Sequence, residues 1–160
     1  MSTRCRIGIC NEDGTIQSIY HHYDGYPEHM VPLLTTYYKD EDIVREMIAL
    51  GSCSHLEKKL NPETDKHSFE TPEEDVSVFY HRDRGEEWEY TQPVISDNED
   101  EFVKLASDSC AYYVLLVPFA FQYHLILCLC ILFAHKLFLL CHSSLTKNNS
   151  LSIVRISLFI

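Results

Sequence analysis

The sequence predicts an α+β fold: a small antiparallel sheet with one or two packed helices, followed by a C-terminal hydrophobic helix. Residues 5–23 alternate apolar and polar side chains around an Asp-Gly turn, which is typical of a β-hairpin. Residues 41–50 place their apolar side chains on one helix face. Beyond residue 108 acidic residues and glycines disappear. These observations indicate an acidic α+β domain at 1–114, a hydrophobic segment at 115–142 and a disordered or poorly packed tail at 143–160.

Charge is distributed unevenly along the chain. Residues 1–108 contain 10 Lys and Arg against all 24 Asp and Glu, a net charge of −14, whereas residues 109–160 contain three basic residues and no acid. Such an acidic domain argues against nucleic-acid binding, which needs a basic face, and it suits a basic partner better than an acidic one. Seven cysteines without a C-x-x-C pair, after a start without an apolar leader, indicate free thiols in a reducing cytosol.

The hairpin is expected to place Cys5, Ile7 and Ile9 on one face of its first strand. Pro27 suits the first turn of a helix, but Pro32 would disturb a helix interior. We therefore expect either a helix from Pro32 to Tyr38 or one that is kinked at Pro32.

The next helix is the clearer of the two. Asp40 can cap it, and Ile43, Val44, Met47, Ile48 and Leu50 form its apolar face. Residues 52–74 are polar and read as a loop, with at most a short helical turn near 55–60. Strands are expected at 76–80 and 88–91, joined by a turn at 81–86 and paired with each other. An acidic helix start follows at 96–101, and a last strand begins at 111–114.

Two ordered blocks carry a family resemblance. The chain reads Tyr-x-His-x-Asp-Gly-Tyr-Pro-Glu at 20–28 and Tyr-His-Arg-Asp-Arg-Gly-Glu at 80–86. With the opening Met-Ser-Thr-Arg-Cys-Arg-Ile-Gly-Ile, these blocks resemble a family of small uncharacterised bacteriophage and prophage proteins over residues 1–114. Relatives tend to have Trp where Tyr23 stands and small residues where Met30 and Pro32 stand. The resemblance implies an intracellular phage-type protein and no established activity.

The two motif blocks also hold the candidate binding residues, which we expect to meet at one edge of the sheet. These candidates are Tyr20, His22, Asp24, Tyr26, His81, Arg82, Asp83 and Arg84. Tyrosine and arginine are good anchors in protein contacts. The first hypothesis is therefore a non-enzymatic protein that grips a host protein or a small ligand, without a cofactor.

Two other classes of function stay open. His22, Asp24, His81 and Asp83 could hold Zn²⁺ or Mn²⁺, or act as acid and base, in a small metal-dependent enzyme. No metal-ligand spacing supports their convergence, however, and ordinary turn hydrogen bonds explain the same residues. The third class is a membrane-anchored accessory protein.

The anchor hypothesis depends on the apolar tail. Residues 113–134 contain 13 Leu, Ile, Val or Phe among 22 residues, enough to cross a bilayer. We expect one helix over most of 118–140, with membrane association through 113–140. The family's last strand tends to continue into a short polar ending, so a frameshift after about Val114 is the competing explanation. Both interpretations remain open at this point.

Overall fold

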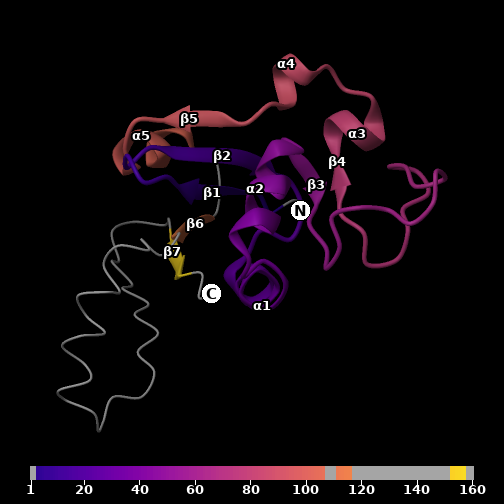
Figure 1. Ribbon diagram of the computed structural model, residues 1–160, viewed down its shortest axis with the longest axis horizontal. Helices are drawn as coiled ribbons and strands as arrows, with labels where there is room; N and C mark the ends of the chain where they lie inside the picture. The colour runs from indigo at the N-terminus through magenta and orange to yellow at the C-terminus, as the bar shows by residue number, and fades with distance from the viewer. Residues whose placement is uncertain (1–2, 107–110, 117–151, 158–160) are drawn as a thin grey trace, which may run out of the picture.

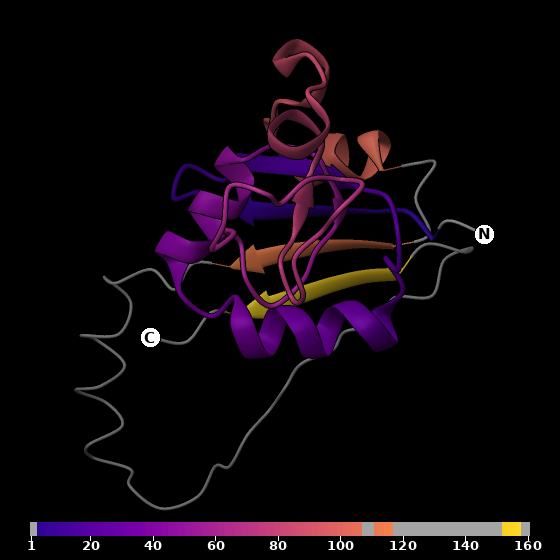
Figure 2. The same cartoon turned by 90° about the vertical axis from the view of Figure 1, so that its right-hand side faces the viewer.

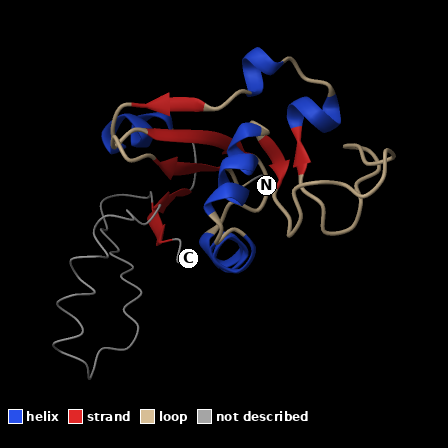
Figure 3. Cartoon of the chain, viewed as in Figure 1, coloured by secondary structure: helices blue, strands red, loops and turns tan. Residues whose placement is uncertain are grey.

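The computed structural model describes residues 3–106, 111–116 and 152–157 (Figure 1). The strands are β1 (Cys5–Cys10), β2 (Ile16–His21), β3 (Cys53–His55), β4 (Val78–Phe79), β5 (Val94–Ser96), β6 (Ala111–Leu116) and β7 (Ser152–Ser157). The helices are α1 (Pro27–Tyr37), α2 (Glu41–Ala49), α3 (Tyr80–Arg84), α4 (Trp88–Thr91) and α5 (Glu99–Leu105) (Figure 3). The predicted α+β class is confirmed.

One sheet joins all of these strands in the order β4-β3-β2-β1-β6-β7, and β5 pairs with β2. The predicted hairpin is confirmed: β1 and β2 are antiparallel, from Cys5 opposite His21 to Cys10 opposite Ile16. The prediction of a wholly antiparallel sheet is wrong, because β1–β6, β6–β7 and β2–β3 are parallel pairs. Alternation along a strand shows which face is buried, but it carries no information about the direction of the neighbouring strand.

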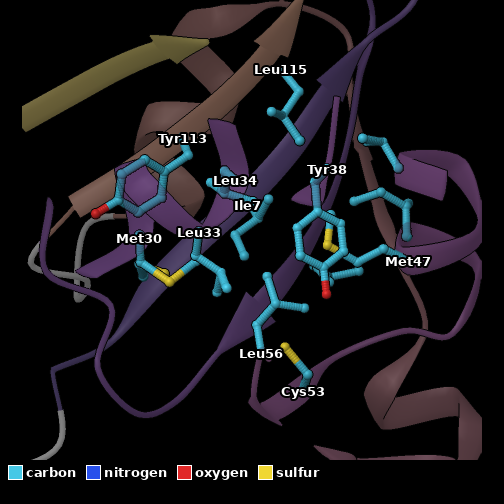
Figure 4. Close-up of a cluster of buried hydrophobic side chains, with 14 of the residues drawn as sticks. Ile7, Met30, Leu33, Leu34, Tyr38, Met47, Cys53, Leu56, Tyr113 and Leu115 are labelled. Carbon is cyan, nitrogen blue, oxygen red and sulfur yellow. The ribbon is translucent and has the colours of Figure 1, made fainter. Parts of the chain in front are cut away.

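The main core lies between one face of the sheet and helices α1 and α2 (Figure 4). Cys5, Ile7 and Ile9 of β1 are fully buried there, as their alternation predicts. Parallel pairing with β6 sets Tyr113 beside Ile7 in the same layer. Helix α2 contributes Val44, Met47 and Ile48, whereas Ile43 of the expected apolar face is 38% exposed. Figure 2 shows α1 running alongside the β6 and β7 edge of the sheet.

A smaller core covers part of the opposite face. Phe102 and Ala106, from α5 and its C-terminal cap, pack against Ile16 of β2, and all three side chains are buried. Asn98 caps α5 by accepting a hydrogen bond from the Glu101 N–H. Leu105, the last residue of α5, is exposed. The sheet is therefore covered by helices on both faces, although unequally.

Several predicted boundaries need correction. Residues 88–91 form helix α4 rather than a strand paired with 76–80, and residues 80–84 form helix α3 rather than a turn. The loop prediction for 52–74 misses β3, which lies between β2 and β4. Helix α1 begins at Pro27 and contains Pro32 in its interior, so the kinked alternative is closer to the structure than a start at Pro32.

The helix expected over 118–140 lies outside the described residues. Tyr113 to Leu116, the first residues of the expected membrane segment, belong to strand β6. Ser152–Ser157, within the tail expected to be disordered or poorly packed, form β7 and pair in parallel with β6. Among the residues that the structure describes, no helix has the length and apolarity needed to cross a bilayer.

Candidate functional site

The two motif blocks border the same strand, β3. From one side, His22 and Tyr23 donate their backbone N–H groups to the carbonyls of Cys53 (3.2 Å) and Ser54 (3.1 Å). From the other side, the Tyr80 N–H donates to the carbonyl of Ser52 at 3.0 Å. Segments almost sixty residues apart therefore flank one short strand. β3 lies inside the sheet, between β4 and β2, and the expected proximity of the Asp24 and Asp83 turns at one sheet edge stays a prediction.

The Asp24-Gly25 turn of the first block is structural. Asp24 is exposed and has a φ of 57°, a conformation that Asp and Asn tolerate better than most residues. Gly25 is buried, and its N–H donates to the Thr3 carbonyl at 2.7 Å. A Cβ at Gly25 would lie 2.7 Å from that same oxygen, so only glycine fits. The Gly25 carbonyl in turn accepts from the Tyr113 hydroxyl at 2.8 Å. This turn ties the N-terminus, α1 and β6 together.

Tyr26 closes the first block at the N-cap of α1. Its side chain is 39% exposed and contacts the ring of His29, with 5.8 Å between the ring centroids. The residue supplies no side-chain hydrogen bond to the helix start. Tyr26 is therefore exposed at the surface, and its role in binding stays a prediction.

The second block is built around a buried carboxylate, Asp83. Its Oδ2 accepts from the Phe79 N–H at 2.7 Å, and its two oxygens accept from Arg82 Nε (2.6 Å) and Nη2 (2.8 Å). Arg82 also donates to the carbonyls of Leu60 and Ser77, both at 2.7 Å. The pair therefore connects β4, α3 and the 56–77 loop. Its hydrogen bonds satisfy buried polar groups and hold backbone segments together.

His67, from the 56–77 loop, completes this network. Its ring Nδ1 accepts from the Glu73 N–H at 3.0 Å, so the proton of the neutral ring lies on Nε2. That Nε2 is 3.5 Å from Asp83 Oδ2, and both side chains are almost completely buried. Nothing in the local sequence marks His67, because its partner is sixteen residues away.

The remaining residues of the second block separate into two environments. The His81 Nδ1 is 2.7 Å from the Glu86 carbonyl, and its ring meets the edge of Trp88. Arg84 lies over the rings of Phe69 and Tyr80, at 4.4 and 5.2 Å from their centroids. Burial raises the pKa of Tyr80 to about 12. His81 and Arg84 remain exposed at the surface.

His21, the neighbour of His22, is buried in the sheet and has a structural role. Its Nε2 accepts from the Leu56 N–H at 3.2 Å, which leaves Nδ1–H to face the Cys5 sulfur at 3.3 Å. Burial, followed by the nearby His55, lowers the pKa of His21 to about 3. Burial also raises the pKa of the Cys53 thiol, so that thiol is not an activated nucleophile. The Cys5 thiol is also buried.

A surface cluster of tyrosine and histidine rings forms where β2 and β3 end. We define it as the imidazole–tyrosine cluster, consisting of Tyr20, His22, Tyr23 and His55. The Tyr20 hydroxyl is 2.8 Å from His22 Nδ1. Tyr23 stacks on His55 with 4.6 Å between centroids, and its other ring neighbour is His22 at 4.3 Å. Tyr23 is 37% exposed and the other three side chains are half-buried, so the cluster is partly open to solvent.

The cluster lies in a locally cationic part of an acidic chain. Partial burial, and then the charges of Arg4, His55 and Arg84, lower the pKa of His22. His22 is therefore neutral at pH 7. In the tautomer whose Nδ1 accepts from the Tyr20 O–H, the Nε2–H of His22 is left to donate to a ligand. Aromatic rings, imidazole nitrogens and nearby guanidinium groups therefore share this part of the surface.

The candidate metal ligands have separate roles. Asp83 is occupied by Arg82 and the Phe79 N–H, Asp24 lies in an exposed turn, and His22 contacts Tyr20. Among the described residues no three His, Cys, Asp or Glu side chains are grouped so that they could hold a metal ion. His22, Asp24, His81 and Asp83 are thus not brought together as one site.

Comparison of the chain with protein-family models, curated proteins and solved structures finds no match. The geometry of the described residues therefore carries the functional argument.

Proposed function

We propose that this protein is a non-enzymatic binding protein of bacteriophage or prophage type. It acts in the bacterial cytoplasm and binds a host protein or a small ligand through the imidazole–tyrosine cluster. The stacked pair of Tyr23 and His55 next to His22 is the observation that supports it most. Stacked aromatic rings at a surface offer a large contact area at low entropic cost, which suits recognition.

The polar groups around the cluster favour recognition over catalysis. His22 can offer Nε2–H as a hydrogen-bond donor, and Arg84 and Arg4 make its surroundings cationic. A ligand with an acceptor or anionic group next to a flat ring fits this chemistry. The nearby thiols of Cys5 and Cys53 are buried, so neither of these two thiols is exposed at this surface.

The alternative of a small metal-dependent enzyme has less support. It needs His22, Asp24, His81 and Asp83 to converge, and Asp83 is already bonded to Arg82 and the Phe79 N–H. Elemental analysis of the purified full-length chain separates the two functions. A stoichiometric zinc or manganese content that is lost in Asp24→Ala would favour the enzyme, whereas the binding protein needs no metal.

The binding function is tested by photo-cross-linking in bacterial cells. A photoreactive residue replaces Tyr23 in one variant and Tyr37, a tyrosine of α1 with similar exposure, in a matched control. We expect a discrete adduct, to a protein or a small molecule, from position 23 but not from position 37. The adduct should disappear when His22→Ala is added. Equal labelling at both positions, or no adduct at position 23, would refute the proposal.

A further inference from the structure

A second surface, separate from the imidazole–tyrosine cluster, runs along α4 and β5. We define the 88–95 face as Trp88, Tyr90, Val94 and Ile95. Their side chains are 40%, 81%, 38% and 63% exposed, respectively. Four large apolar side chains exposed within eight consecutive residues differ from single apolar residues scattered over a surface, and such groups often mark interaction sites. Figure 1 shows α4 leading into β5 along the outside of β2.

The backbone of β5 adds a second, independent feature. β5 pairs with β2 in antiparallel register, Ile95 opposite Gln17, and among the described strands β2 is its only partner. In an antiparallel pair, alternate residues direct their N–H and C=O groups to the other edge. An edge strand of this kind is a template for a further extended segment.

The charges around this face determine which partner it suits. Residues 85–103 contain seven acidic residues and no Lys, Arg or His. Three of the acids, Glu99, Asp100 and Glu101, lie in the first turn of α5, directly after β5. A second copy of this chain would bring the same acidic surface against itself, at a formal charge of −11 on each molecule. A basic partner instead gains from these carboxylates.

We propose that β5 and the 88–95 face bind an extended, basic segment of another protein, which adds as a strand to the free edge of β5. The apolar side chains of that segment contact Ile95 and Tyr90, and its Lys or Arg side chains face the carboxylates that flank β5. The backbone hydrogen bonds provide affinity, and alternation of basic and apolar residues provides specificity.

The single tryptophan of the chain, Trp88, makes this proposal directly measurable. The full-length protein is titrated with a six-residue peptide of alternating Lys and Val, and Trp88 emission is followed. A Glu-Val peptide of equal length and a Lys-Val peptide with a central proline are the controls. We expect a saturable change with the Lys-Val peptide alone. In about 1 M salt, where the Debye length is about 3 Å, half-saturation should need about tenfold more peptide.

Two variants distinguish binding at the 88–95 face from general electrostatic attraction between a basic peptide and an acidic protein. Ile95→Lys should raise the half-saturation concentration about tenfold or more, because it adds a like charge and removes an apolar contact. Ile43→Lys adds the same charge at an exposed isoleucine of α2 and should leave the titration unchanged. An equal response to the Glu-Val peptide, equal weakening by both variants, or no response to the Lys-Val peptide would overturn the proposal.

If the chain's own residues or a second copy of the chain cover the 88–95 face, the protein without peptide gives a different result. If Ile95→Lys alone shifts Trp88 emission at every protein concentration, the chain's own residues cover this face. If the shift depends on protein concentration, a second copy covers it. Either result overturns the proposal, which expects unchanged emission before peptide is added. Cross-linking at position 23 is a separate readout, so the binding function proposed for the imidazole–tyrosine cluster can fail while this surface stands.

Discussion

Replacement of Asp83 by alanine should destabilise the fold far more than loss of an ordinary surface acid. The carboxylate accepts from the Phe79 N–H and twice from Arg82, and His67 lies 3.5 Å away. Its side chain is 3% exposed, so water cannot replace these partners without local opening. Alanine would leave a guanidinium group and a backbone N–H without their acceptor.

The expected loss of stability follows from the two groups that Asp83→Ala leaves without their acceptor, the Arg82 guanidinium and the Phe79 N–H. Breaking a buried ion pair by removing one partner costs about 3–5 kcal/mol, and a buried N–H left without an acceptor costs about 1–3 kcal/mol. Arg82 is 24% exposed and keeps the carbonyls of Leu60 and Ser77, which reduces the first contribution. We therefore expect a total loss of about 3 kcal/mol, which corresponds to a fall in Tm of roughly 10 °C.

Urea unfolding followed by circular dichroism measures this loss. Asp83→Asn keeps an acceptor and the side-chain volume, so about 1–2 kcal/mol should be lost. Asp65→Ala removes an exposed acid from the same loop and should change the free energy of unfolding by no more than about 0.5 kcal/mol. If Asp83→Ala costs less than about 1 kcal/mol, or no more than Asp65→Ala, the network of Arg82, Asp83 and His67 does not hold this region together.

Three further predictions concern the sheet and the first turn. The pKa of His21 falls from its ordinary 6.5 to about 3, so its contribution to stability is complete above pH 6.5 and is lost as the pH falls toward 3. Urea midpoints between pH 6.5 and 5 should therefore fall with pH, and less steeply in His21→Gln. Gly25→Ala should lower the free energy of unfolding in urea by about 2–3 kcal/mol, because the added Cβ would overlap backbone atoms. Gly14 has a φ of +86° and open space around it, so Gly14→Ala should cost about 1–2 kcal/mol. Equal losses for the two variants would contradict this reasoning. Tyr113→Phe removes the buried bond to the Gly25 carbonyl and should lower stability by about 1–2 kcal/mol, and an unchanged thermal midpoint would contradict that role.

Local sequence determined the elements whose signals lie within a few residues. The Asp-Gly turn and the alternation of Cys5, Ile7 and Ile9 predicted the first hairpin and its buried face, and both are confirmed. Asp40 and the apolar stripe predicted helix α2, although Ile43 at its margin is exposed. Periodicity and capping express the preferences of the chain itself, so they can be read without a partner.

The second motif shows where prediction of secondary structure from neighbouring residues fails. The sequence predicts a turn at 81–86 and a strand at 88–91, yet both segments contain helical residues. The Asp83 carboxylate that holds the Phe79 N–H, and Gly85 with a φ of 70°, fix the short helix α3. Four or five residues carry too little periodicity to distinguish a helical turn from a strand, and tertiary partners decide.

The candidate site shows the same division between what the local sequence predicts and what only the tertiary structure decides. Sequence identified Tyr20 and His22, but not His55, which completes the cluster from β3, or His67, which completes the network of Asp83. Parallel pairing of β2 with β3, which the sequence did not reveal, brings Tyr23 onto His55. Residue identity fixes what each side chain can donate or accept. Only the packing of distant segments decides which side chains meet, because long-range pairing leaves no mark in the local pattern of either strand.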